Sequence, residues 1–308
     1  MEKKIRKDKL TILFCGIFLI FISTCSSYTF FYVGDKYHKL GKDYYNSEKK
    51  IERERKKLLE LEDELDLYND IDNNIRELKK EFFDRAQKLE EDINSGNSDK
   101  KIAYLTFDDG PYYNTYQVLD ILDRYNVGAT FFTTSINGQF CRDNKDYDCY
   151  NLYSEYIKRG HTIANHTYTH AIFKGLYDSP NTFMEAVIKQ EEHIKSFTDG
   201  YVTNIVRFPG GSSTANHFKV KDGVIELLRQ RGYGWVDWSS LDGDGGYLPN
   251  RDKAWSTFTG SINENIEVIL FHDYSDITTN MLPDAIEYLE NNGYVLLPLF
   301  YESSMVNK

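Results

Sequence analysis

Two adjacent carboxylates, Asp108 and Asp109, stand at the end of an apolar, β-favouring run in YLTFDDGPYYNT and are followed at once by Gly-Pro. Neighbouring carboxylates repel each other, so a pair at the end of a strand is costly unless a cation or a reaction needs it. One carboxylate can bind a metal ion while the other stays free as a base. Taken alone, the pair would also suit a turn or a helix cap.

Two histidines in HTYTH have the spacing to complete such a metal site. His166 and His170 are four residues apart, so a helical turn or a tight loop can bring both side chains to one face. Catalytic zinc commonly takes two His and one carboxylate and leaves a fourth position for water. The sequence therefore predicts a divalent metal site, most readily for Zn²⁺, with Co²⁺, Mn²⁺ or Ni²⁺ as alternatives.

The elements that must position these groups follow Lys101, where strand-like and helix-like segments alternate. This alternation predicts βα units and a parallel sheet, either as a barrel or as an open doubly wound sheet. In both architectures active sites lie at the C-terminal ends of the strands, and the polar clusters of this chain follow apolar strands. The predicted strands lie within 101–107, 128–134, 161–170, 205–211, 234–240, 266–273 and 295–300, and the predicted helices within 116–126, 152–160, 181–198, 223–233 and 281–294.

The order of these clusters resembles that of the NodB-type polysaccharide deacetylases, carbohydrate esterase family 4. TFDDGP matches the first motif of the family and HTYTH the second, while RFPGG resembles the third and LFHD the fifth. The resemblance implies a deformed (β/α) barrel of the NodB type over residues 101–303. It also implies a metal-dependent hydrolase that removes acetyl groups from a glycan.

The resemblance assigns a role to each matching residue of the first three motifs. Asp108 would be the general base, and Asp109 would hold the metal ion together with His166 and His170. Arg207, in RFPGG, would orient the base. Such a set suits amide hydrolysis, because a metal ion can polarise the acetyl oxygen while the base takes a proton from water.

Three further residues would complete the site by the same resemblance, and Tyr112 is a candidate from its position alone. His272, in LFHD, would be the general acid, which suits an imidazole with an ordinary pKa of about 6.5. Leu270 would line the pocket for the acetyl methyl group, and the backbone N–H of Gly210 would help to stabilise the oxyanion. Tyr112, just after the first motif, either stacks on sugar rings or is an exposed loop tyrosine.

The fourth motif departs from the family, which has an Asp followed by Trp at this point. In DWSSLDGDGG, Asp244 aligns best with that Asp, and Gly245 takes the place of the Trp. Asp237 and Asp242 are alternatives to Asp244. Trp238 either lines the groove or packs in the core. The missing Trp leaves one wall of the acetyl pocket unassigned.

The N-terminus combines five Lys and Arg residues with an apolar run over 10–34. A run of about 20 apolar residues can span a bilayer, and the preceding basic residues favour a cytoplasmic N-terminus. We therefore expect residues 1–34 to be a cytoplasmic tip with a single-pass transmembrane anchor, which places the catalytic domain outside the cytoplasm. A lipoprotein signal and a cleaved signal peptide are the alternatives.

Residues 35–97 lack Pro and are rich in Glu and Lys, with apolar residues repeating every seven positions. This spacing predicts a long helical stalk, with coiled-coil self-association into a homo-oligomer as one outcome. A single amphipathic helix lying on the catalytic domain is the alternative. Residues 94–101 then form a linker.

Charge and cysteine content narrow the class of protein. A net charge of −11 gives no general attraction to nucleic acid, and we expect no nucleic-acid partner. Cys141 and Cys149 lie in a polar segment, where export would permit a disulfide and where two free thiols are the alternative.

Location and motifs together predict an N-deacetylase of a cell-wall glycan. Peptidoglycan, at N-acetylglucosamine, is favoured because the anchor and stalk would hold the enzyme at the wall. The alternatives are another glycan (N-acetylmuramic acid, exopolysaccharide, chitin oligomer or xylan), a catalytically decayed glycan-binding protein, and a different hydrolase on a similar barrel.

Overall fold

The computed structural model describes residues 36–59, 67–135, 149–248 and 250–308. Within these ranges no helix has the length and apolar character needed to cross a membrane. The predicted anchor at 10–34 lies outside the described residues, as does Cys141, so the anchor and the disulfide stay predictions.

The catalytic domain is built on one parallel sheet, as the alternating pattern predicted. Its strands run in the order β5-β4-β3-β2-β1-β7-β6, and β8 pairs with the first half of β1. The strands are β1 (Lys101–Asp108), β2 (Thr130–Thr133), β3 (Thr162–Asn165), β4 (Ile205–Val206), β5 (Gly234–Trp235), β6 (Ser240–Leu241), β7 (Ile266–His272) and β8 (Tyr294–Leu297).

The segment 236–239 makes the sheet curl. It joins β5 to β6, which lie at opposite ends of the strand order. Five peptide steps from Trp235 to Ser240 span at most about 18 Å, so the two edges must approach each other. The single strand predicted over 234–240 is therefore wrong. The chain forms two short strands there because it has to cross the mouth of a partly closed barrel.

The two faces of the sheet bury different sets of residues. On β1, Ala103, Leu105 and Phe107 face an outer core shared with helices. Ile102 and Tyr104 face the inner core of the curled sheet. This alternation follows from the period of two along a strand. It also places Asp108 on the inner face, directly above the apolar core.

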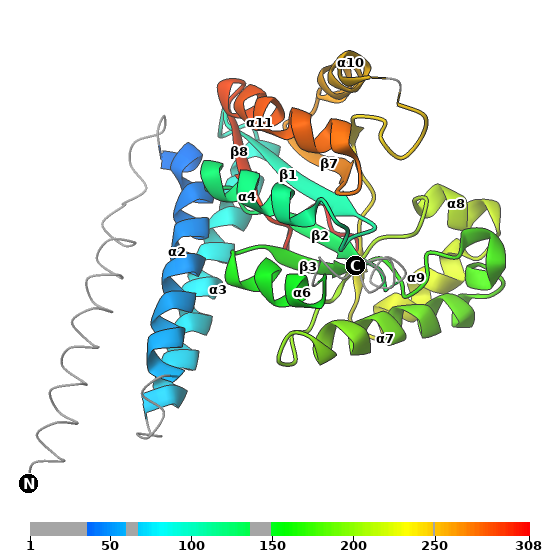
Figure 1. The fold of residues 1–308 in the computed structure, drawn as a ribbon, viewed down its shortest axis with the longest axis horizontal. Helices are drawn as coiled ribbons and strands as arrows, with labels where there is room; N and C mark the ends of the chain where they lie inside the picture. The colour runs from blue at the N-terminus through cyan, green and yellow to red at the C-terminus, as the bar shows by residue number, and fades with distance from the viewer. Residues whose placement is uncertain (1–35, 60–66, 136–148, 249) are drawn as a thin grey trace, which may run out of the picture.

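Helices cover the outer face and form a lobe beside it (Figure 1). The lobe has its own core around Phe183, Phe208 and Val224. The helices of the catalytic domain are α4 (Thr115–Tyr125), α6 (Cys149–Lys158), α7 (Pro180–Ser196), α8 (Ser212–His217), α9 (Lys221–Gln230), α10 (Arg251–Ser261) and α11 (Asp276–Asn291), with a π-helical turn at Ile172–Leu176.

The predicted stalk is helical but does not project from the domain. It consists of two helices, α2 (Lys36–Leu59) and α3 (Leu67–Asn94), which lie side by side against the sheet (Figure 1). Ala86, Leu89 and Ile93 of α3 are buried in the inner core of the barrel. These are members of the heptad series, so the apolar stripe proposed for self-association is used within the chain itself.

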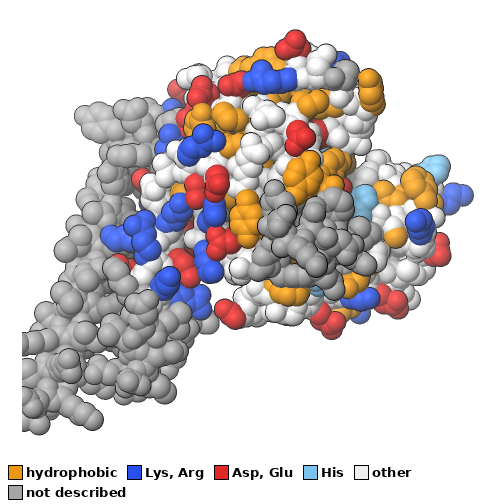
Figure 2. Space-filling view, viewed as in Figure 1, with side chains coloured by type: hydrophobic (Ala, Val, Ile, Leu, Met, Phe, Trp, Pro, Cys, Tyr) orange, Lys and Arg blue, Asp and Glu red, His pale blue; other side chains and the backbone are white. Residues whose placement is uncertain are grey.

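Polar and close contacts fix this helical pair to the domain. The buried carboxylate of Glu90 accepts hydrogen bonds from the Tyr104 hydroxyl of β1 and from the Ser304 amide. On α2, a Cβ at Gly41 would lie 2.1 Å from the Leu296 carbonyl oxygen, so only glycine allows this approach to β8. An ion pair of 3.1 Å between Lys49 of α2 and Asp123 of α4 adds to the contact. Figure 2 shows that basic and acidic side chains are intermixed on this side of the molecule.

Candidate active site

Asp108 and Arg207 meet on the inner face of the sheet, at the C-terminal ends of β1 and β4. The Arg207 guanidinium donates to Asp108 Oδ1 at 2.8 Å and to Thr106 Oγ1 at 2.7 Å. Both partners of this ion pair are buried. Further hydrogen bonds to backbone carbonyls of the crossing segment 236–239 hold the guanidinium in one orientation. Arg207 therefore lies where the sequence placed it, against the candidate base.

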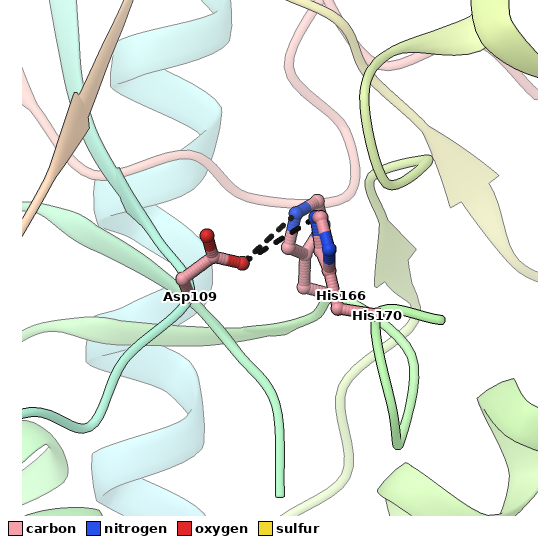
Figure 3. A group of neighbouring side chains, drawn as sticks. All are labelled: Asp109, His166 and His170. Carbon is pink, nitrogen blue, oxygen red and sulfur yellow. Dashed lines mark ion pairs between the residues drawn. The ribbon is translucent and has the colours of Figure 1, made fainter. Parts of the chain in front are cut away.

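Asp109, His166 and His170 converge from the loops after β1 and β3 (Figure 3). Asp109 Oδ1 lies 3.5 Å from His170 Nε2 and 3.7 Å from His166 Nε2. Two ligand atoms in a tetrahedral zinc site, each about 2.0–2.2 Å from the metal ion, are about 3.3–3.6 Å apart. The three side chains fit a single divalent ion, as the sequence predicted.

Backbone strain is concentrated at these ligands. Asp109 has φ 70° and His170 has φ 46°, and Thr167 between the two histidines has φ 65°. Non-glycine residues rarely adopt this left-handed conformation, and it persists where the surrounding structure enforces it. The strain turns the Asp109 side chain away from the strand direction and toward the histidines.

His166 is held in the form that a metal ion requires. Its Nδ1 lies 2.9 Å from the Arg207 carbonyl oxygen, so Nδ1–H donates there and Nε2 is left with a lone pair toward Asp109. Burial lowers the pKa of His166 to about 4, although nearby carboxylates oppose this. The imidazole is consequently neutral at physiological pH.

His272 faces this cluster from the end of β7. Its Nε2 lies 3.9 Å from Asp109 Oδ2, and its Nδ1 lies 2.6 Å from Asp244 Oδ1. Burial opposes the charged imidazolium, but the hydrogen bond and charge of Asp244, together with the charges of Asp108 and Asp109, outweigh it and raise the pKa of His272 to about 9. His272 therefore carries a proton at neutral pH, as a general acid must.

Asp244→Asn is expected to move the basic limb of the kcat/KM profile to lower pH and to reduce activity at pH 8. Without the Asp244 charge, the charges of Asp108 and Asp109 alone oppose the effect of burial, so the pKa of His272 falls and the imidazolium loses its proton at a lower pH. A pH–rate series on a glycan that the wild type deacetylates measures this, with the exposed Asp252→Asn as a control. An unchanged basic limb would contradict the role of Asp244.

The three candidate aspartates of the fourth motif have different positions and partners in the structure. Asp244, which aligns best with the fourth-motif Asp, is the partner of His272. Asp237 instead binds the backbone N–H of Ser212 at 2.9 Å and its hydroxyl at 2.6 Å, at the start of α8. Asp242 lies fully buried behind Asp244.

The candidate substrate contacts lie around this centre. Leu270 is two residues before His272 on the same face of β7 and pairs with Thr106. Trp238 packs at the edge of the inner core, and the end of its ring lies against Gly211. Gly210 is exposed, and among the described residues its amide has no hydrogen-bond acceptor. Tyr112 is half-buried and meets the ring of Tyr274 edge-on.

The absence of a side chain at Gly245 leaves room for the imidazole ring of His272. A Cβ at position 245 would lie 3.0 Å from His272 Cε1, which is closer than side chains normally approach. The ring of Tyr274 lies 4.9 Å from the His272 ring. In this chain His272 is thus flanked by the backbone of Gly245 and the ring of Tyr274.

The sequence model of the family described as polysaccharide deacetylase matches residues 95–229. A peptidoglycan-N-acetylglucosamine deacetylase of Bacillus cereus is 34% identical over 209 residues, which cover 64% of this chain and 85% of that protein. The chain belongs to the polysaccharide deacetylase family. It is therefore a hydrolase, as the motifs predicted.

Solved structures resemble this deacetylase over about two thirds of its length. The catalytic domain of a peptidoglycan N-acetylglucosamine deacetylase from Eubacterium rectale is similar with a TM-score of 0.61 and 32% identity, covering 68% of this chain and 93% of that one. A Streptococcus mutans CE4 esterase is similar with a TM-score of 0.56 and 25% identity, over 66% and 87% of the two chains. The parallel, curled α/β fold is that of the family.

Sequence reasoning missed several residues that build the site of the deacetylase. Thr106 shares the Arg207 guanidinium with Asp108, and its position two residues before Asp108 on β1 was the available signal. Tyr274 follows LFHD closely and could have been noticed for the same reason. Thr278 on α11 contacts Asp244, and no motif in the sequence marks it.

Proposed function

We propose that the chain removes N-acetyl groups from amino sugars of a cell-wall polysaccharide, with peptidoglycan N-acetylglucosamine as the favoured substrate. The observation that carries this is the convergence of Asp108, the Asp109–His166–His170 cluster and His272 at one mouth of the barrel. The name of the Bacillus cereus relative supports the choice of glycan.

The residues would hold one divalent metal ion, and we propose Zn²⁺, with Co²⁺, Mn²⁺ or Ni²⁺ as alternatives. Two neutral imidazoles and one carboxylate are a donor set that zinc prefers. When bound, the ion supplies Lewis-acid polarisation of the acetyl oxygen and a more acidic water.

The chain's own residues would divide the proton transfers. Asp108 takes a proton from the attacking water, and Arg207 keeps its carboxylate turned toward the site. The exposed Gly210 amide donates to the oxygen on which negative charge develops. His272 gives its proton to the leaving nitrogen, since Nε2 faces the cluster while Nδ1 is occupied by Asp244.

Acetate release from N-acetylated peptidoglycan tests this function. The full-length chain is stripped of metal with a chelator and assayed before and after Zn²⁺ is added back. We expect acetate release to be lost on chelation and to recover when Zn²⁺ is added, because the proposed reaction needs the ion that His166 and His170 would hold. His170→Ala should not recover.

Other outcomes identify the competing functions. Release from chitin oligomers, exopolysaccharide or acetylated xylan, but not from peptidoglycan, would replace the substrate. Metal uptake and glycan binding without acetate release from any of them would indicate a glycan-binding protein. Release of amino acids instead of acetate would indicate an amidase.

We also propose that the chain is held at the cell membrane, with the catalytic domain outside the cytoplasm. The basic residues and apolar run of 1–34 support this. Because α2 begins at Lys36 and packs directly on the sheet, the catalytic domain would then lie next to the bilayer instead of at the end of a stalk. Recovery of the full chain in a salt-washed soluble fraction would contradict this.

A further inference from the structure

A second buried carboxyl group lies behind the Asp244–His272 pair. Asp242 is 0% exposed and Thr278 of α11 is 1% exposed. Thr278 Oγ1 lies 2.7 Å from Asp242 Oδ2 and 2.8 Å from Asp244 Oδ2. Asp242 Oδ1 also accepts the backbone N–H of Asp244 at 3.1 Å. One threonine hydroxyl thus bridges two carboxyl groups.

The number of hydrogens available to these oxygens decides which group donates each hydrogen bond. Two ionised carboxylates can only accept, and the Thr278 hydroxyl has one hydrogen to donate. Ser275 Oγ also lies 2.8 Å from Thr278 Oγ1 and can donate its hydrogen there, which leaves the Thr278 hydrogen for one carboxylate. Both contacts to carboxyl oxygens have hydrogen-bond length, so the hydrogen of the second one comes from a carboxyl group. Asp244 already accepts the Nδ1–H and the backbone N–H of His272, so its ionised form is the one satisfied. Asp242 is left as the donor.

We propose that Asp242 and Thr278 are positioning residues for the general acid. The Asp242 carboxyl donates to Thr278 Oγ1, the Thr278 hydroxyl donates to Asp244 Oδ2, and Asp244 thereby keeps His272 oriented toward the metal ligands. The inference rests on the role proposed above for His272. Neither Asp242 nor Thr278 touches the reacting atoms.

The electrostatics of the buried pair agree with this direction of donation. Burial, followed by the charge of Asp244, raises the pKa of Asp242 to about 7. Asp244 is the titratable group in contact with Asp242, and His272 lies beyond it, whereas Thr278 of α11 and Ser275, the N-cap of α11, do not titrate. Asp242 therefore keeps its proton below about pH 7 and loses it above, unlike an ordinary aspartic acid.

Both carboxylate oxygens of Asp244 accept hydrogen bonds in this network. Oδ1 binds the imidazole, while Oδ2 binds the His272 backbone N–H at 2.8 Å and the Thr278 hydroxyl. If the Thr278 hydroxyl is lost, no chain of hydrogen bonds links the Asp242 carboxyl group to Asp244, and the two carboxyl groups face each other without a bridge. The expected consequence is a less well oriented acid with unchanged substrate contacts.

Matched substitutions test this in the metal-loaded full chain, on the glycan that the wild type deacetylates. Asp242→Asn places a permanent N–H donor toward Thr278, and Thr278→Ser keeps the hydroxyl, so both should retain at least about half of the wild-type kcat. Asp242→Ala and the isosteric Thr278→Val remove one link each. Their kcat should fall about 10- to 100-fold with KM nearly unchanged, as for loss of one hydrogen bond to a charged group.

The pH dependence provides a readout that a purely structural role would not change. Asn at position 242 cannot lose a proton, whereas Asp242 does so near pH 7. The ratio of kcat for Asp242→Asn to kcat for the wild type should therefore rise between about pH 6 and pH 9.

Two results would overturn the inference. Wild-type kcat in Thr278→Val, together with an inactive His272→Ala, would remove Thr278 and Asp242 from the positioning of the acid. Equal losses in Asp242→Asn and Asp242→Ala, with native melting curves and metal content, would show that no donor is needed at position 242. Full activity in His272→Ala would instead overturn the proposed acid, and this inference with it.

Discussion

Asp108→Asn is expected to lower acetate release by about 10²–10⁴-fold, the range that a general base contributes, while the chain still binds its metal ion. The amide keeps the size of the side chain but cannot take a proton from water. The ligands Asp109, His166 and His170 are unaltered, so metal content should stay at the wild-type level. Turnover on the wild-type substrate and elemental analysis of the purified protein measure both quantities.

The buried ion pair adds a second consequence to this variant. Arg207 is 0% exposed, and in Asp108→Asn it loses its charged partner, which costs about 3–5 kcal/mol in comparable buried pairs. Thr106 and two backbone carbonyls still accept from the guanidinium, so the fold should survive with a lower melting temperature. A melting curve therefore accompanies the assay.

Asp109→Asn is the matched control, because the neighbouring carboxylate is assigned to the metal ion. That variant should lose bound metal as well as activity. If Asp108→Asn were folded, metal-loaded and within tenfold of wild-type turnover, Asp108 would not be the base.

A chain that starts at Lys101 is expected not to fold cooperatively, whereas a chain that starts at Lys36 should melt like the full-length protein. Removing α2 and α3 uncovers the inner core of the barrel around Ile102 and Tyr104. Each Leu or Ile side chain that loses its burial costs about 1.5–3 kcal/mol, against a total stability of about 5–15 kcal/mol for a domain. Calorimetry or circular dichroism of the two chains distinguishes the outcomes.

Single substitutions on α3 make the same test without a truncation. Leu89→Ala should lower the free energy of unfolding by about 2–5 kcal/mol, because Leu89 is 0% exposed in the inner core. The adjacent Lys88→Ala removes exposed ion pairs to Glu91 and Asp92 and should cost at most about 1 kcal/mol. Equal effects of the two substitutions would show that α3 is not part of the folded core.

The catalytic set could be predicted from the sequence because each member lies in a short motif with its own chemistry. Adjacent carboxylates after an apolar strand, and two histidines four residues apart, are local patterns whose ligand types already specify a divalent ion. The period of two along β1 likewise determined that Asp108 shares a face with Tyr104 and Thr106. The choice of Asp244 for the fourth motif came from its place in an ordered motif set, whereas its contact with His272 came from the structure.

The tertiary structure decided the features that depend on contacts between distant segments. A heptad stripe is apolar whether it meets a second chain or its own barrel, so the pattern of 35–97 could not show that Leu89 fills the inner core. The crossing of 236–239 follows from the sheet order. The bridge from Asp242 through Thr278 to Asp244 joins positions more than thirty residues apart by single hydrogen bonds, and hydrogen bonds leave no periodic trace in a sequence.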